Sequence, residues 1–113
     1  MVKKEIPEIT VTDAGVTVIS QFVDCDFPIN FCVKNTGSKT IRLAVYGGYD
    51  ATPANMTKEH ETDGSPGNPD LAAGAAMSMI LENPYDYALL TAICPGAGET
   101  SKVKGYILWK GHT

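Results

Sequence analysis

The chain has 113 residues, of which 43% are hydrophobic and 19% are charged, as in an ordinary folded protein. This length predicts a single domain over residues 1–113, with one core that needs no metal or disulfide to fold. The net charge is −4 and the nine lysines and arginines are scattered, so we expect no nucleic-acid partner. No apolar run reaches the roughly 18 residues of a membrane-spanning helix, so we expect no membrane partner either.

The start of the chain and its cysteines both indicate a reducing compartment. Met1–Glu8 has no apolar stretch of the kind found in secretory signals. We therefore expect the protein to be made and kept in a cytoplasm, or to be a processed piece. Cys25, Cys32 and Cys94 allow at most one internal bridge, and each lies in an apolar stretch, so we expect three reduced structural thiols.

Short β-branched and aromatic runs, separated by turn residues, predict an all-β domain. In chain order the expected strands cover residues 6–12, 16–23, 29–35, 40–46, 76–81, 85–94 and 102–110. Pro7 interrupts the first strand, which suits a sheet edge, and residues 1–8 are expected to form an N-terminal arm. The third and fourth strands alternate most clearly. They flank Asn35–Lys39, which predicts a hairpin loop in which Gly37 can take a positive φ.

Strict alternation within these strands predicts which side chains form the core. The residues expected to point inward are Ile29, Phe31, Val33, Ile41, Leu43, Val45, Met77, Met79, Leu81, Tyr87, Leu89 and Trp109.

The stretch from Gly47 to Ala75 is a long connection rich in Pro, Gly, Asn and Asp, within which Thr52-Pro53 can begin one short helical turn. Connections of this length are usually functional or disordered. Its prolines reduce the entropy that the loop loses on docking, so we expect it to contact partner chains, helped by the N-terminal arm. The residues expected to bind a partner are Tyr49, Asp50, Pro53, Met56, His60, Pro66, Pro69, Lys3 and Lys4.

Seven short strands predict a single immunoglobulin-like or fibronectin-like β-sandwich, in which the long connection crosses between the sheets. A jelly roll is the main competitor, but it requires an eighth strand. The sequence from Phe31 to Ser38, followed by Ile41–Leu43, resembles the V-x-N-x-G-S hairpin of immunoglobulin-like modules in phage virion and prokaryotic surface proteins. Leu71–Ala75 is similar to the L-x-x-G start of their next strand. The resemblance implies a binding or scaffolding module and carries over no catalytic residue.

Candidate reactive groups are few. Asp24, Asp26 and Asp50 would gather around calcium only if their loops met, and the spacing of a known calcium loop is missing. His60 and His112 are too distant in sequence to indicate a zinc site. The glycine-rich residues 96–102 lack the ending of a phosphate-binding loop and are expected to form a hairpin loop. Cys94 has no predictable base beside it. We therefore expect no catalytic residue and no cofactor.

The hypothesis from the sequence is a non-enzymatic module that docks to other protein chains in repeated copies or as a homo-oligomer. Its most concrete form is a capsid decoration (cement) or other minor protein of a phage or virus particle, made in the host cytoplasm and located in the virion. A β-sandwich exposes edge strands, along which an arm from a neighbouring chain can pair. The alternative is a ligand- or carbohydrate-binding sandwich of a bacterial surface or secreted assembly, kept in the cytoplasm or exported without a classical signal.

Overall fold

The structure, a computed structural model, describes residues 1–24 and 28–110. The described residues form eight strands and one short 3₁₀ turn, η1. Their bounds are β1 (Val2–Val11), β2 (Val16–Phe22), β3 (Ile29–Asn35), β4 (Arg42–Gly48), η1 (Pro53–Asn55), β5 (Thr57–Glu61), β6 (Ala76–Leu81), β7 (Tyr87–Ile93) and β8 (Ser101–Trp109).

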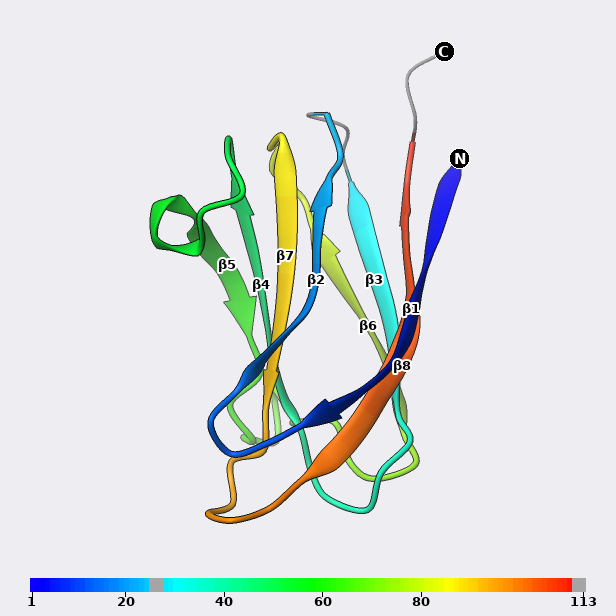
Figure 1. The fold of residues 1–113 in the computed structure, drawn as a ribbon, viewed down its shortest axis with the longest axis vertical. Coiled ribbons are helices and arrows are strands. Elements are labelled where there is room, and N and C mark those ends of the chain that lie inside the picture. The colour runs from blue at the N-terminus through cyan, green and yellow to red at the C-terminus, as the bar shows by residue number, and fades with distance from the viewer. Residues whose placement is uncertain (25–27, 111–113) are drawn as a thin grey trace.

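The strands form two antiparallel sheets that pack face to face (Figure 1). Sheet A has the order β1-β8-β3-β6, and sheet B has the order β2-β7-β4-β5. The prediction of an all-β sandwich is confirmed.

The strand order differs from that of an immunoglobulin-like sandwich. Among the described strands only β4 and β5 are joined as a hairpin, and every other connection passes from one sheet to the other. Eight strands in this order form a jelly roll. This fold is the alternative named from the sequence, which predicts only seven of its eight strands. The missing strand is β5, which lies within the stretch expected to be a loop over residues 47–75.

β5 escaped prediction because its sequence carries no apolar residue to mark a buried face. Thr57–Glu61 reads Thr-Lys-Glu-His-Glu, and four of its five side chains are exposed. It pairs with β4 as the last strand of sheet B, where charged residues are tolerated at an edge. The expected helical turn is limited to Pro53–Asn55, preceded by Thr52 at the N-cap position.

Two expected hairpin loops are crossovers. β3 lies in sheet A and β4 in sheet B, so the segment Asn35–Lys39 connects sheets rather than paired strands. The same holds for residues 96–100, between β7 and β8. The alternation around Asn35 is real, but alternation shows which face is buried and not which strand is the neighbour.

Residues 1–8 are not a free arm. β1 begins at Val2 and pairs with β8 along its whole length, so these residues belong to an edge strand of sheet A. The register shifts between Ile6 and Ile9, where Pro7 removes a backbone donor. The prediction of an edge strand at Pro7 is confirmed.

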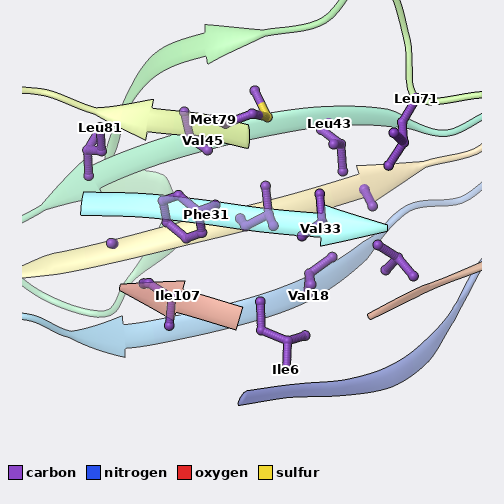
Figure 2. Close-up of a cluster of buried hydrophobic side chains, with 14 of the residues drawn as sticks. Ile6, Val18, Phe31, Val33, Leu43, Val45, Leu71, Met79, Leu81 and Ile107 are labelled. Carbon is purple, nitrogen blue, oxygen red and sulfur yellow. The ribbon is translucent and has the colours of Figure 1, made fainter. Parts of the chain in front are cut away.

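The core lies between the two sheets (Figure 2). Ten of the twelve predicted core residues are buried; the exceptions, Met77 and Tyr87, are partly exposed. The face assigned to β7 was wrong, since Ala88, Leu90 and Ala92 join the core cluster and the alternate residues Tyr87 and Leu89 do not. β7 is nearly apolar throughout, which leaves no alternation to read.

Asn35 is the polar anchor of the fold. Its side chain is fully buried at the end of β3. The side-chain amide donates to the carbonyls of Lys39, at 2.6 Å, and Leu71, at 3.1 Å, while its oxygen accepts from the Gly37 N–H at 3.1 Å and the Ser101 hydroxyl at 2.7 Å. These four bonds use the full capacity of an asparagine. They tie the β3–β4 and β5–β6 connections to the start of β8.

Two glycines are required for close approach and not for a positive φ. A Cβ on Gly37 would lie 2.2 Å from the Ser101 Oγ and 2.5 Å from the Lys102 backbone nitrogen. A Cβ on Gly105 would lie 2.0 Å from the carbonyl oxygen of Cys32. The expectation that Gly37 takes a positive φ was therefore wrong. Glycine is needed there because residues of β8 fill the space that a side chain would occupy.

Replacing Leu43 with Ala should lower the free energy of unfolding by about 2–5 kcal/mol, the range for a truncated buried leucine. Leu43 is fully buried. Urea denaturation measures the change, with Ile80→Ala as the control because Ile80 is 47% exposed. A loss at Leu43 no larger than at Ile80 would contradict the assigned core.

Replacing Asn35 with Leu should lower the free energy of unfolding by at least about 3 kcal/mol, because several buried polar groups lose their partner together. Asn30→Leu is the matched control, since Asn30 lies on the opposite face of the same strand and is partly exposed. Equal midpoints in urea for the two variants would show that the Asn35 bonds contribute no net stability.

Candidate assembly surfaces

Two of the four sheet edges are protected against pairing with another chain. β1, at one edge of sheet A, has the Pro7 irregularity and an exposed ion pair of 3.3 Å between Lys3 and Glu5. β5, at one edge of sheet B, carries Lys58 and Glu61, which form an ion pair of 3.3 Å, and also Glu59 and His60. Charges, proline and irregular register are the features by which edge strands resist pairing.

β6, the other edge of sheet A, has none of this protection. Its sequence from Ala76 to Leu81 contains no charge, proline or glycine, and its register with β3 is unbroken. Asn35 N–H donates to the Ala75 carbonyl, so the next hydrogen-bonded positions on β6 are the alternate residues 77, 79 and 81. The backbone groups of Ala76, Ser78 and Ile80 therefore point away from sheet A, and their side chains are exposed.

β2, the other edge of sheet B, is also uncharged along Val16–Phe22. Its register with β7 shifts once, between Thr17 and Ile19, and is regular from there to Phe22. Val23 N–H donates to the Asp86 carbonyl, which places positions 19 and 21 in hydrogen-bonded pairs with β7. The backbone groups of Ser20 and Phe22 then face outward; the Phe22 carbonyl accepts from the Gln21 side chain at 3.0 Å.

Exposed apolar side chains coincide with these two edges. Phe22 on β2 is 48% exposed and Ile80 on β6 is 47% exposed. Phe22 stacks on Tyr87 with ring centroids 5.2 Å apart, which holds its ring at the surface. Beside Ile80 lies a hollow of about 260 Å³, which is also lined by Glu59, His60, Glu82 and Asn83. A strand laid along β6 would meet an apolar side chain and open space.

Four of the expected partner-binding residues gather in the turn between β4 and β5. Tyr49 is 75% exposed at its tip. The Asp50 carboxylate accepts hydrogen bonds from the Thr52 N–H at 2.9 Å and the Asn55 side chain at 3.2 Å. The Met56 N–H donates to the Pro53 carbonyl at 3.1 Å. The turn is therefore built by local bonds, with Tyr49 projecting from it.

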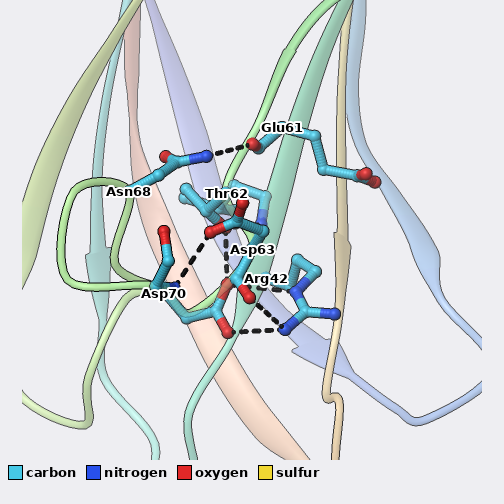
Figure 3. Close-up of polar contacts among 8 residues, drawn as sticks. Arg42, Glu61, Thr62, Asp63, Asn68 and Asp70 are labelled. Carbon is cyan, nitrogen blue, oxygen red and sulfur yellow. Dashed lines mark hydrogen bonds and ion pairs between the residues drawn. The ribbon is translucent and has the colours of Figure 1, made fainter.

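The segment after β5 is fixed by a network around Arg42 (Figure 3). The guanidinium makes a two-pronged contact with Asp70, at 3.1 and 3.0 Å, and donates to the Asp63 carbonyl at 3.0 Å. Thr62 donates to Asp70 at 2.7 Å and accepts from the Leu43 N–H at 3.0 Å. The Asp70 hydrogen bond is the largest cause of the raised pKa of Arg42. Sequence reasoning missed this network, because Arg42 fits the polar half of an alternating strand.

The remaining expected partner-binding residues do not join the turn at Tyr49. Pro66 and Pro69 are exposed and belong to the segment held by Arg42, at the other end of β5 (Figure 1). Lys3 and Lys4 lie on β1, at the edge of sheet A opposite to β6. The nine residues therefore mark several separate places on the surface and not one continuous site.

The expected calcium candidates do not form a site in the described part of the chain. No group of three or more histidine, cysteine, aspartate or glutamate side chains is placed to hold a metal ion among residues 1–24 and 28–110. Both carboxylate oxygens of Asp50 accept hydrogen bonds from residues of its own turn. Asp26 and His112 lie outside the described residues.

A shallow groove of about 590 Å³ crosses the outer face of sheet A. At its centre the Cys32 Sγ lies 3.4 Å from the Ser78 Oγ, and a hydrogen bond with Cys32 is the largest cause of the raised pKa of Tyr106. The Lys3 ammonium sits 4.5 Å from the centre of the Tyr106 ring. The face of the aromatic ring is thus already covered by the chain itself.

The two described cysteines are free thiols, and Cys25 lies outside the described residues. Cys94 is buried and its thiol contacts the Val11 carbonyl at 3.5 Å. Burial raises the pKa of Cys94, which keeps it protonated and a poor nucleophile. Within residues 1–24 and 28–110 there is no helix long and apolar enough to cross a membrane.

No family model matches the chain, and no curated protein matches it. Solved structures do. A crystal structure of PirA has a TM-score of 0.62 over 91% of each chain, at 14% identity. A chain from Bacillus endospore appendages, which form a family of disulfide-linked pili, has a TM-score of 0.62 at 15% identity, over 98% of this chain and 88% of that chain. These identities establish a shared fold alone.

The environment of Glu59 predicts how the stability of the fold depends on pH. Hydrogen bonds from Tyr85 and Asn83 lower the pKa of Glu59 below its usual value. A lowered carboxyl pKa adds stability above the usual value of about 4.3, and this stability is lost as the pH falls through the folded-state pKa. Tyr85→Phe removes the larger cause but keeps the ring that packs against Gly47.

The Tyr85→Phe variant should therefore lose less of its thermal stability between pH 6 and pH 3 than the parent does. Circular dichroism melts across that range measure the difference. Tyr49→Phe serves as the control because that side chain is 75% exposed. Parallel pH profiles for Tyr85→Phe and the parent would show that the Tyr85–Glu59 bond is absent in solution.

Proposed function

We propose that the protein is a non-enzymatic structural subunit that works in an assembly of repeated copies. The observation that carries the proposal is the contrast among the edges. β1 and β5 are charged and irregular, whereas β2 and β6 are uncharged and display Phe22 and Ile80. An exposed uncharged edge promotes pairing with another chain, and natural proteins usually block it. Two unblocked edges on one small domain favour a protein whose work is association.

A filament is the form of assembly that we propose first. One structure of similar fold belongs to endospore appendages that form pili, which supports a subunit that repeats along a fibre. The decoration of a phage or virus particle, expected from the sequence, is the second form of the same assembly role. The proposed location depends on the form of assembly. A filament subunit would lie in a surface appendage, and a decoration protein would lie in a virion. Purified protein that polymerises alone favours the filament, whereas binding only to a preformed particle favours decoration.

The turn that carries Tyr49 has a secondary part in this proposal. Its exposed ring and the neighbouring Met56 offer apolar contacts of the kind enriched at interfaces. Carbohydrate binding, the alternative considered from the sequence, has less support. Sugar-binding grooves use a bare aromatic face, and the Tyr106 ring in the groove of sheet A is covered by Lys3.

Replacing Ile80 with Lys should reduce assembly sharply and leave folding intact. Ile80 is 47% exposed, so the lysine can remain in water, and lysine on an edge strand opposes pairing. Light scattering after size exclusion, with electron microscopy of concentrated samples, measures assembly, and the thermal midpoint reports folding. Thr57→Lys on the already charged β5 is the matched control and should assemble like the parent.

The proposal predicts that the parent forms multimers as its concentration rises from micromolar to millimolar. A parent protein that stays monomeric across that range, and that also fails to bind any phage or virus particle, would overturn the assembly role.

A further inference from the structure

We propose that the copies join head to tail, with the β6 edge of one copy pairing with the β2 edge of the next. The inference rests on the assembly role proposed above and specifies the partner as a second copy of this chain. It also specifies the two elements that meet. Sheet A of one copy then continues into sheet B of its neighbour.

The positions of the two edges require two different neighbours. In the sandwich β1 packs against β2, and β6 packs against β4, beside β5. β2 and β6 are therefore on opposite sides of the molecule, each next to a protected edge of the other sheet. One neighbouring copy cannot cover both, so each copy has one neighbour at β6 and another at β2.

The backbone groups on the two edges match in kind. β6 presents the outward N–H and C=O groups of Ala76, Ser78 and Ile80, and β2 presents those of Ser20 and Phe22. Antiparallel strands exchange such groups at every second residue, so a short ladder forms without displacing any backbone bond within either sheet. The Phe22 carbonyl, which accepts from the Gln21 side chain, has a second lone pair for the seam. Pairing at an exposed edge is a general way for one chain to recognise another.

Side chains favour this pair over pairs that involve the protected edges. An incoming β1 would bring Lys3, Glu5 and Pro7 to the seam, and an incoming β5 would bring a row of charges. β2 brings no charge. Its Phe22, like Ile80 on β6, is exposed in the single copy and would be covered where the two edges meet. The seam would then bury the two large apolar side chains that the strands of a lone copy leave half exposed at these edges.

A contact between two different surfaces does not close on itself unless the rotation between copies closes a ring, and otherwise it propagates as an open filament. The ladder would join only two or three residues of each edge, so each step should be weak and assembly should depend strongly on concentration. This distinguishes the proposal from a symmetric dimer, in which the same edge of two copies would meet and growth would stop at two.

The test blocks one edge at a time with proline. Ser78→Pro removes the outward N–H at the centre of β6, and Ser20→Pro removes the outward N–H of β2. Neither N–H is bonded within its own sheet, so both variants should keep the fold. Ser78→Ala and Ser20→Ala keep the N–H and are the matched controls. Ile80→Lys and Phe22→Lys replace the prolines if a proline variant shows a lowered thermal midpoint.

Head-to-tail pairing predicts that each proline variant alone is a monomer at concentrations where the parent polymerises. An equimolar mixture of the two should form a heterodimer and no larger species, because one usable β2 and one usable β6 remain. Light scattering and native mass spectrometry measure these masses. Both alanine variants should polymerise.

Two results overturn the pairing while leaving the assembly role in place. If Ser20→Pro alone forms a dimer, β6 pairs with itself; if both proline variants polymerise like the parent, neither edge is the seam. A parent that never assembles overturns the assembly role itself. The two failures are therefore distinguishable in one set of measurements.

Discussion

The buried side chain of Asn35 is the constraint on which the rest of the structure depends. A jelly roll passes the chain between its sheets at nearly every connection, and such connections place backbone polar groups beside the core. Asn35 satisfies groups from Lys39 and Leu71, which belong to two of these connections, and from Ser101, the first residue of β8. Because all four of its bonds are made, Asn35 leaves none of its own side-chain polar atoms unpaired at this end of the sandwich. The Arg42–Asp70 contact then holds the segment that leads from sheet B to Leu71.

Once the sandwich is closed, the proposed assembly role depends on the four edges of its two sheets. Core residues are committed to packing, and the reactive groups of the described chain are buried, engaged or scattered. Charged side chains lie on β1 and β5, whereas β2 and β6 carry none. In the proposed assembly, protecting two edges while leaving two uncharged would direct association to the β2 and β6 sides. The same pattern would prevent the unregulated pairing that four bare edges invite.

Much of the fold can be predicted from the sequence, because alternation reports burial directly. The core faces of β3, β4 and β6 follow from period-two patterns such as Ile29, Phe31 and Val33. Alternation does not identify every strand or its buried face, since β5 has no apolar face and β7 is apolar on both faces. It also does not identify neighbouring strands, so Asn35–Lys39 was predicted to be a hairpin loop. Strand neighbours are set by long-range pairing. The bare edges also required the structure, since an uncharged strand becomes a surface only when it is known to be outermost.

Residue-resolved amide hydrogen exchange, compared between dilute and assembled protein, tests the central claim most directly. The account predicts that the amides of Ala76, Ser78 and Ile80 on β6, and of Ser20 and Phe22 on β2, exchange quickly in the monomer and become protected on assembly. Amides that face outward on β1 and β5 should exchange at the same rate in both states. Assembly that leaves the β6 and β2 amides unprotected, or that protects β1 or β5 in their place, would contradict the account.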